Sequence, residues 1–294
     1  MIQPDVHEYT AGDGARNGMS VYRSDDQLKG PVIVCLPALG VRAGFYAQFA
    51  TGLAQACAAA VITADWRGKG MSSLRVTRKH PFGYAEVLHQ DLPALIAKVQ
   101  QLFPGRPCYM LGHSLGGQMA LLYASCHHGM LAGVILVAAG SNHYASFSGL
   151  NGIKRMLGLR MIRLVTQVLG YFPGETLGFA GTESKNMMLD MTHESLWPTY
   201  KVQNGTMPYN QLLTELSLPV LILSLEGDSM VPSTCAQTLA NKLKTAAVER
   251  RTLLARDHGL ERFNHFKWAR QPAPVVEAVS GWLAKTTGNN SASS

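Results

Sequence analysis

The sequence lacks several features that would place the protein in a membrane or an oxidising compartment. No apolar stretch among its 294 residues reaches the ~18 residues needed to span a bilayer. The first residues, MIQPDVHEYTAGDG, contain no apolar segment typical of a secretory signal. The five cysteines are odd in number and none forms a CxxC pair, which favours buried free thiols. We therefore expect a cytoplasmic protein with no stable membrane insertion.

Charge is sparse and unclustered. Only 15% of the residues are charged, and the excess of Lys and Arg gives a formal net charge of +7. The basic residues are scattered, and no dense basic tract is interleaved with aromatic side chains, which argues against nucleic-acid binding. A preference for anionic substrates or surfaces stays open.

Cofactor and metal motifs are missing too. The sequence has no glycine-rich phosphate loop and no nicotinamide-binding fingerprint, so we expect no cofactor. His127 and His128 are adjacent but have no third ligand nearby in the sequence. We therefore expect no metal site, and interpret this pair as the end of a helix before Gly129.

The sequence does contain a regular alternation of strand-like and helix-like segments. Continuous apolar runs, typical of strands buried on both faces, alternate with segments of helical spacing. The strand-like segments are residues 30–40, 60–70, 106–114, 131–140, 218–228 and 248–255, and the helix-like segments are 46–59, 84–103, 115–129 and 272–285. This order predicts an α/β fold with a mostly parallel sheet flanked by helices on both faces.

The alternation lapses between residues 141 and 212. The sequence there is helical, apolar on one face and basic on the other, and contains no strongly buried strand. We interpret 141–212 as an inserted helical cap that divides the core into residues 1–140 and 213–285. The last residues, 286–294, are polar and are expected to be disordered.

A serine lies where the third strand-like segment meets a helix. The pentad Gly112-His113-Ser114-Leu115-Gly116 matches Gly-x-Ser-x-Gly, the pattern of a nucleophile elbow, in which a strained turn exposes the serine. The elbow lies at the carboxyl edge of a parallel sheet, where ligands bind. A purely structural turn is the alternative, but the strand-to-helix context favours Ser114 as a nucleophile.

A serine nucleophile needs a base, and the base needs an acid to orient it. Asp228 comes at the end of the fifth strand-like segment, just past its apolar run, which predicts a position at the same sheet edge as Ser114. A loop aspartate that caps the next helix is the alternative. In enzymes with this elbow, acid and base follow the serine in that order. Two histidines come after Asp228, His258 and His265, and spacing alone does not choose between them.

Two backbone N–H groups should hold the negative charge that develops during such chemistry. The first is the amide of Leu115, directly after the nucleophile. The second should come from the loop after the first strand-like segment. We expect Leu39 to supply it, with Ala38 or Gly40 as alternatives.

These features resemble the α/β-hydrolase fold, in its serine-aminopeptidase-like (Hydrolase 4) group, and more narrowly predicted α/β-hydrolases of bacteria. The stretch DWRGKGMSS (65–73) is similar to a loop motif of the family, Asp-x-Arg-Gly-x-Gly-x-Ser. LGYFPGETLGF (169–179) resembles a cap motif of the group, and HFKWARQPAPVVEAVSGWL (265–283) its closing segment. The resemblance covers nearly all of residues 1–285.

The resemblance implies which residues act. The family's nucleophile falls on Ser114, its acid on Asp228, and its base on His265 rather than His258. The group usually has Gly before the base, whereas Asn264 stands here, which keeps His258 as the second choice.

Substrate contacts are less well determined by the sequence. We expect four side chains to bind the substrate. His113 should line the floor of the pocket, His143 and Tyr144 should face it after the fourth strand, and Phe172 should contact the substrate from the cap. An apolar stripe in the cap favours a hydrophobic acyl substrate, although packing within the cap explains it better. Its members are Ile153, Met156, Leu157, Val165, Leu169 and Phe172.

The implied activity is that of a serine hydrolase that cleaves an ester, thioester or amide through an acyl-enzyme. Acyl transfer to an alcohol, amine or thiol would use the same residues, and the sequence does not separate the two. A non-hydrolytic binding or tailoring member of the fold is less favoured, because the Ser, Asp and His set is complete. The expected partner is a small acyl substrate, and the oligomeric state stays open.

Overall fold

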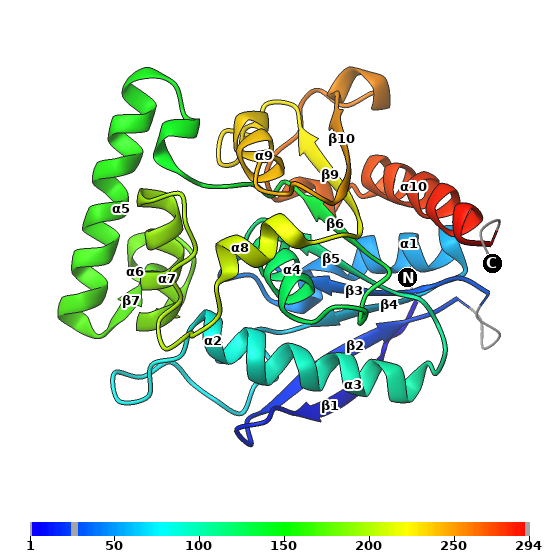
Figure 1. The fold of residues 1–294 in the computed structure, drawn as a ribbon, viewed down its shortest axis with the longest axis horizontal. Coiled ribbons are helices and arrows are strands. Elements are labelled where there is room, and N and C mark those ends of the chain that lie inside the picture. Colours follow the sequence, from blue (N-terminus) through cyan, green and yellow to red (C-terminus); the bar gives the residue numbers. More distant parts are fainter. Residues whose placement is uncertain (1, 25–28, 292–294) are drawn as a thin grey trace.

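A computed structural model describes residues 2–24 and 29–291, and its centre is an eight-stranded sheet (Figure 1). The strand order is β1-β2-β4-β3-β5-β6-β9-β10, and every pairing from β4 to β10 is parallel. The strands are β1 Asp5–Thr10, β2 Arg16–Tyr22, β3 Val32–Leu36, β4 Ala60–Ala64, β5 Cys108–His113, β6 Gly133–Val137, β9 Pro219–Leu225 and β10 Ala247–Leu253. The predicted α/β-hydrolase architecture, a mostly parallel sheet flanked by helices, is confirmed.

The first two strands were not predicted. β1 and β2 pair antiparallel with each other, and β2 pairs antiparallel with β4, so they form one end of the sheet. Most of β1 is exposed or half-buried, and its sequence, DVHEYT, is polar. An edge strand with so little apolar surface gives no continuous hydrophobic signal in the sequence.

The sheet separates two hydrophobic cores. Alternate residues of one strand enter different cores: Val32 and Val34 of β3 face one side, and Ile33 and Cys35 the other. Helices α3 and α4 pack in the first core, and α1 and α10 in the second. This two-sided burial is why the strands are continuous apolar runs.

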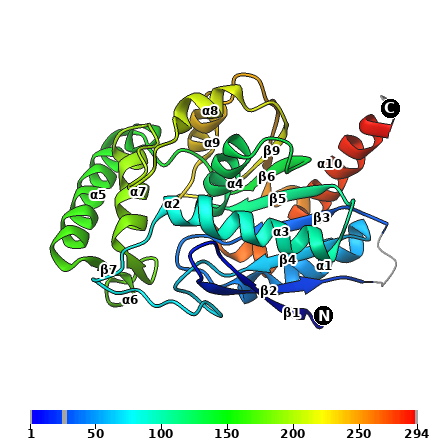
Figure 2. The same cartoon turned by 60° about the horizontal axis from the view of Figure 1, so that its bottom comes forward.

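Helices α1, α3, α4 and α10 form in the predicted helix-like segments, whereas α8 and α9 were not among those segments. Pro93 lies in the first turn of α3, directly after a π-helical turn at Val87–Asp91. A proline is tolerated in the first turn of a helix, so Pro93 does not interrupt α3. Figure 2 shows α3 and α4 on one side of the sheet. The core helices are α1 Ala47–Cys57, α2 Tyr84–Glu86, α3 Leu92–Leu102, α4 Leu115–Cys126, α8 Tyr209–Glu215, α9 Ser233–Ala240 and α10 Ala273–Ser291.

The segment 141–212 lies at one side of the sheet in both views (Figures 1 and 2). It is mostly helical, as expected, but also contains a two-stranded sheet formed by β7 and β8. Its elements are α5 Gly149–Leu169, β7 Tyr171–Pro173, α6 Gly174–Leu177, β8 Thr182–Ser184 and α7 Lys185–Leu196. Helix α8 crosses the expected boundary at 212 and packs against α4, so it is continuous with the core.

The structure differs from the sequence-based expectation at the chain's end. Helix α10 continues to Ser291, so residues 286–291 are helical rather than disordered. The expected disorder of 292–294 lies outside the described residues. Among the described residues, none of the helices combines the length and apolarity needed to cross a membrane.

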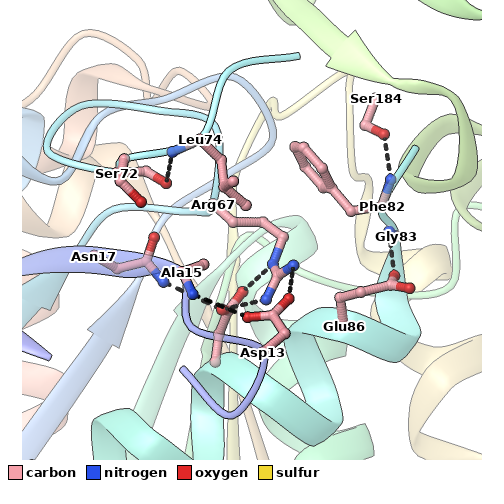
Figure 3. A network of polar contacts seen from close by, with 12 residues as sticks. Asp13, Ala15, Asn17, Arg67, Ser72, Leu74, Phe82, Gly83, Glu86 and Ser184 are labelled. Atoms are coloured by element: carbon pink, nitrogen blue, oxygen red, sulfur yellow. Dashed lines mark hydrogen bonds and ion pairs between the residues drawn. The ribbon is translucent and has the colours of Figure 1, made fainter. Parts of the chain in front are cut away.

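A buried arginine fastens the β1–β2 hairpin to the rest of the core (Figure 3). Arg67 is only 3% exposed, and its guanidinium donates to both carboxylate oxygens of Asp91 at 2.7 Å and to Asp13 at 2.9 Å. Asn17 Nδ2 also donates to Asp91. The two-point Arg–Asp geometry compensates the cost of burying the charge. It gives the arginine of the DWRGKGMSS stretch a structural role.

Candidate active site

Ser114 occupies the single residue between β5 and α4. Its backbone has φ 53° and ψ −116°, a conformation that residues with a side chain rarely adopt. Two bonds hold it there: the Ser114 N–H donates to the Val137 carbonyl at 3.1 Å, and the Ser114 carbonyl accepts from the Gly117 N–H at 3.0 Å. The strained turn leaves Ser114 partly exposed, while Leu115 and His113 on either side are buried.

The two glycines of the pentad are required by space. A Cβ on Gly112 would lie 2.1 Å from the backbone carbon of Gly116, and a Cβ on Gly116 would lie 2.3 Å from the carbonyl oxygen of Leu36. Any side chain at either position would therefore push strand β5, helix α4 or strand β3 apart.

Asp228 and His265 form a buried pair near Ser114. Asp228 follows β9, and its Oδ1 accepts hydrogen bonds from the N–H groups of Met230 at 2.9 Å and Val231 at 3.1 Å. Its Oδ2 lies 2.7 Å from His265 Nδ1. A carboxylate only accepts hydrogen bonds, so Nδ1 carries a proton. His265 Nε2 is buried and makes no hydrogen bond to a described residue.

The second candidate base lies elsewhere. His258 ends a short 3-10 turn and packs against Phe263, with Nδ1 3.9 Å from a carboxylate oxygen of Glu277 on α10. It does not line the cavity that contains Ser114. The structure thus pairs Asp228 with His265 and not with His258.

Ser114 and His265 line one cavity of about 570 Å³, a size typical of sites for small molecules. Most of its wall is apolar, and the core and the 141–212 segment both contribute. The apolar lining includes Leu39, Val41, Leu115, Leu159, Ile162, Phe179, Met191, Met230, Val231 and Phe266. The polar lining side chains are Ser114, Asn142, Arg155, Ser195 and His265.

The loop after β3 brings backbone N–H groups to this cavity. The Ala38 N–H is already used, because it donates to the Tyr46 hydroxyl at 2.9 Å. For the amides of Leu39 and Leu115, no hydrogen bond is found among the described residues. Leu115 is the first residue of α4, where backbone N–H groups have no partner within the helix. Of the three donors considered for the loop, Ala38 is therefore the least suitable.

The loop is held in place from both sides. Trp66 Nε1 donates to the Pro37 carbonyl at 3.0 Å, and Gly40 touches the 141–212 segment. Gly40 has φ +76°, and a Cβ there would lie 1.8 Å from the carbonyl oxygen of Ala180. Only glycine fits this contact without displacement.

None of the four predicted substrate-binding side chains lines the cavity. His113 is fully buried behind it, with Nδ1 2.8 Å from the Tyr46 hydroxyl and its ring 4.8 Å from the His265 ring centroid. Burial lowers the pKa of His113 well below its ordinary value, so this imidazole is neutral. It supports His265 rather than touching a ligand.

The other three also differ from the expectation. His143 and Tyr144 pack on each other, with ring centroids 4.6 Å apart, outside the cavity wall. Phe172 is buried against Phe179, and it is Phe179 that lines the cavity.

The apolar stripe predicted for the cap is correct only in part: Met156 and Val165 pack against the first hydrophobic core and Phe172 is buried. Ile153 and Leu157 are more than half exposed, whereas Leu159 and Ile162 line the cavity. Apolar residues occur around much of this helix, so helical spacing does not show which stripe faces inward.

Comparison with known families identifies the class. The family model described as Hydrolase_4, Serine aminopeptidase, S33, matches residues 29–261. The chain belongs to this family of α/β-hydrolases. The match includes Ser114 and Asp228 and ends before His265. Among curated proteins, no match is found.

Solved structures share the fold at low identity. Est1E from Butyrivibrio proteoclasticus, with bound ferulic acid, has a TM-score of 0.62 at 16% identity, over 95% of this chain and 99% of its own. An esterase from Rhodococcus sp. ECU1013 has 0.57 at 20%, over 95% and 98%. The haloalkane dehalogenase DbeA from Bradyrhizobium elkani USDA94 has 0.62 at 16%, over 98% and 100%. These similarities show the fold, which hosts more than one chemistry.

Proposed function

We propose that the protein is a serine hydrolase that cleaves ester or thioester bonds through an acyl-enzyme on Ser114. The observation that supports this most is the His265–Asp228 pair: His265 lines the same cavity as Ser114, and its Nε2 has no hydrogen-bond partner among the described residues. A serine, a carboxylate and an imidazole, in that chain order, are the components of a nucleophile–acid–base triad.

In the first half of the proposed reaction, Ser114 Oγ attacks the substrate carbonyl carbon while His265 Nε2 takes the hydroxyl proton. The Ser114–His265 hydrogen bond required for this step forms when substrate is bound, as is common for catalytic contacts. Asp228 holds the imidazole in the tautomer with the proton on Nδ1 and stabilises the imidazolium that forms. His265 then gives its proton to the leaving alcohol or thiol.

The carbonyl oxygen becomes an oxyanion in this step. We propose that the amides of Leu39 and Leu115 stabilise it, because both lie at the cavity and neither has another described partner. A single donor of this kind contributes about 10²–10³ in kcat. In the second half, water attacks the acyl-enzyme, with His265 again accepting and returning the proton.

The segment 141–212 is proposed to act as a cap over this site. Helices α5 and α7 contribute Leu159, Ile162 and Met191 to the cavity wall, opposite the strand ends that contribute Ser114. Its apolar surface suits the hydrocarbon part of an acyl substrate.

Replacement of the proposed nucleophile tests this function. We expect Ser114→Ala to abolish turnover of 4-nitrophenyl esters while the circular dichroism spectrum stays unchanged. Ser125→Ala is the matched control, because Ser125 also lies on α4 but its hydroxyl donates to the Leu122 carbonyl and it does not line the cavity. Retention of esterase activity by Ser114→Ala would refute the proposed function.

A further inference from the structure

The catalytic cavity contains a guanidinium that the proposed reaction does not use. Arg155 comes from α5 and is half-buried in the cavity wall. No Asp or Glu lines the cavity among the described residues, and the Asp228 carboxylate is shielded behind His265. If His265 is set aside, Arg155 is thus the side chain that gives this wall its positive charge.

Arg155 has few partners for a buried cation. Its Nε donates to the Asn142 carbonyl at 3.3 Å, and its Cζ lies 4.2 Å from the ring centroid of Phe147. No carboxylate of the described residues lies within 4 Å of it. The buried Glu194 influences it electrostatically, but the oxygens of Glu194 accept from Ser141 Oγ and the Asn142 N–H. For the terminal nitrogens of Arg155, no acceptor is found among residues 2–24 and 29–291.

Asn142 adds a second unsatisfied group to the same wall. Its Oδ1 is buried and has no hydrogen-bond partner, and no described residue bonds its side-chain NH₂ group. Because no partner fixes the orientation of this carboxamide, it can present its NH₂ group to a ligand. A carboxylate oxygen of a ligand can accept a hydrogen bond from that NH₂ group.

We propose that Arg155 and Asn142 form a subsite for a carboxylate carried by the ester substrate. This inference rests on the proposed function and specifies its substrate class: esters that bear an anionic group a few atoms from the scissile bond. The planar guanidinium offers two parallel N–H donors that match the two oxygens of a carboxylate.

Electrostatics support this subsite. Burial lowers the pKa of Arg155, because its guanidinium has lost part of its hydration. The guanidinium nevertheless stays charged. A bound carboxylate would replace that hydration inside an otherwise apolar cavity. The net charge of +7 for the chain also favours the approach of an anion.

Matched pairs of esters test the proposal. One pair places the charge on the acyl group: mono-(4-nitrophenyl) glutarate and its neutral methyl ester. The other places it on the leaving group: 4-acetoxybenzoate and its neutral methyl ester. In at least one pair we expect wild-type kcat/KM to favour the anion by about tenfold or more, the factor that about 1.4 kcal/mol supplies.

Substitution of Arg155 should remove that preference. In Arg155→Gln the charged and the neutral member of the pair should react with equal kcat/KM, because the group that favours the anion is gone. Arg160→Gln, which removes an exposed cation from the same helix, should keep the preference. If wild type shows no preference for either anion, or if both arginine variants behave alike, the proposal is overturned.

Two further measurements cover the failure of an assay. If Arg155→Gln does not fold, Arg155→Lys replaces it. Lysine keeps the positive charge near Glu194 but lacks the planar guanidinium, so the preference for the anionic ester should fall severalfold. An unchanged preference overturns the proposal. If no ester is cleaved, the proposed function fails by itself. Calorimetric titration of monomethyl glutarate into wild type and Arg155→Gln then tests whether the subsite binds a carboxylate. Binding by wild type alone supports the proposed subsite, and any other result overturns the proposal.

Discussion

Replacement of Asp228 by Asn should remove most of the activity while leaving the loop after β9 intact. In the native protein, Oδ1 of Asp228 accepts two backbone N–H bonds and Oδ2 lies 2.7 Å from His265 Nδ1. In Asp228→Asn the remaining oxygen can keep both backbone bonds. The new NH₂ group then faces His265 Nδ1, which must become an acceptor, so the proton moves to Nε2.

The tautomer determines the size of the effect. With Nε2 protonated, His265 cannot take the proton of Ser114. In triad enzymes the same change lowers kcat by about 10⁴, which corresponds to about 5.4 kcal/mol of activation free energy. Folding should change little, because the two backbone donors keep their acceptor. Asp228→Ala should lose activity as well, and also stability, by about 1–3 kcal/mol for each buried N–H left without a partner.

The assay combines ester kinetics with urea unfolding of both variants. Asp257→Asn is the charge-matched control, because Asp257 is exposed and pairs only with the exposed Arg256 at 3.6 Å. Asp228→Asn with more than about a tenth of wild-type kcat would contradict the tautomer argument. An equal loss in Asp257→Asn would show that net charge, and not the bond to His265, matters.

Three further predictions test the site and its support. His265→Ala should lower kcat/KM far more than His258→Ala, and the reverse ranking would reassign the base. In Gly40→Ala the new Cβ would lie 1.8 Å from a backbone oxygen and should displace the loop after β3, which carries the Leu39 amide. We expect kcat to fall about 10²–10³-fold. Gly44→Ala, with open space around its Cβ, should leave kcat unchanged. Burial raises the pKa of Asp190 to about 7, so between pH ~4 and 7 the folded state holds a proton that the unfolded state has lost. The contribution of Asp190 to the free energy of unfolding is therefore greatest below pH ~4. It falls by about 1.4 kcal/mol per pH unit as the pH rises to about 7. Urea unfolding between pH 4.5 and 6.5 should show this slope in wild type relative to Asp190→Asn; parallel curves would refute it.

The parts of the fold that could be predicted are those with strong local signals. A strand such as β5 is apolar on both faces, and the elbow after it needs glycine on either side of Ser114. Both features follow from contacts that the chain makes with its own neighbours in sequence. The β1–β2 hairpin gives no such signal, because its anchor is Arg67, which lies 54 residues after its partner Asp13.

The rest of the site depends on contacts between distant segments. Sequence spacing left His258 and His265 as alternatives, and only the fold shows which imidazole meets Asp228. The role of Arg155 could not be predicted, because it is one of several cations on a basic helix. What distinguishes it is the cavity wall and the absence of an ion-pairing partner among the described residues, and neither is visible in the sequence.

The central claim is that Ser114 becomes acylated. The most direct measurement is the intact mass of the protein after incubation with a fluorophosphonate, followed by peptide mapping of the adduct. The proposed function predicts one adduct, on Ser114, that is absent from Ser114→Ala and strongly slowed in His265→Ala. No adduct on the native protein, or an adduct on another residue, would contradict it.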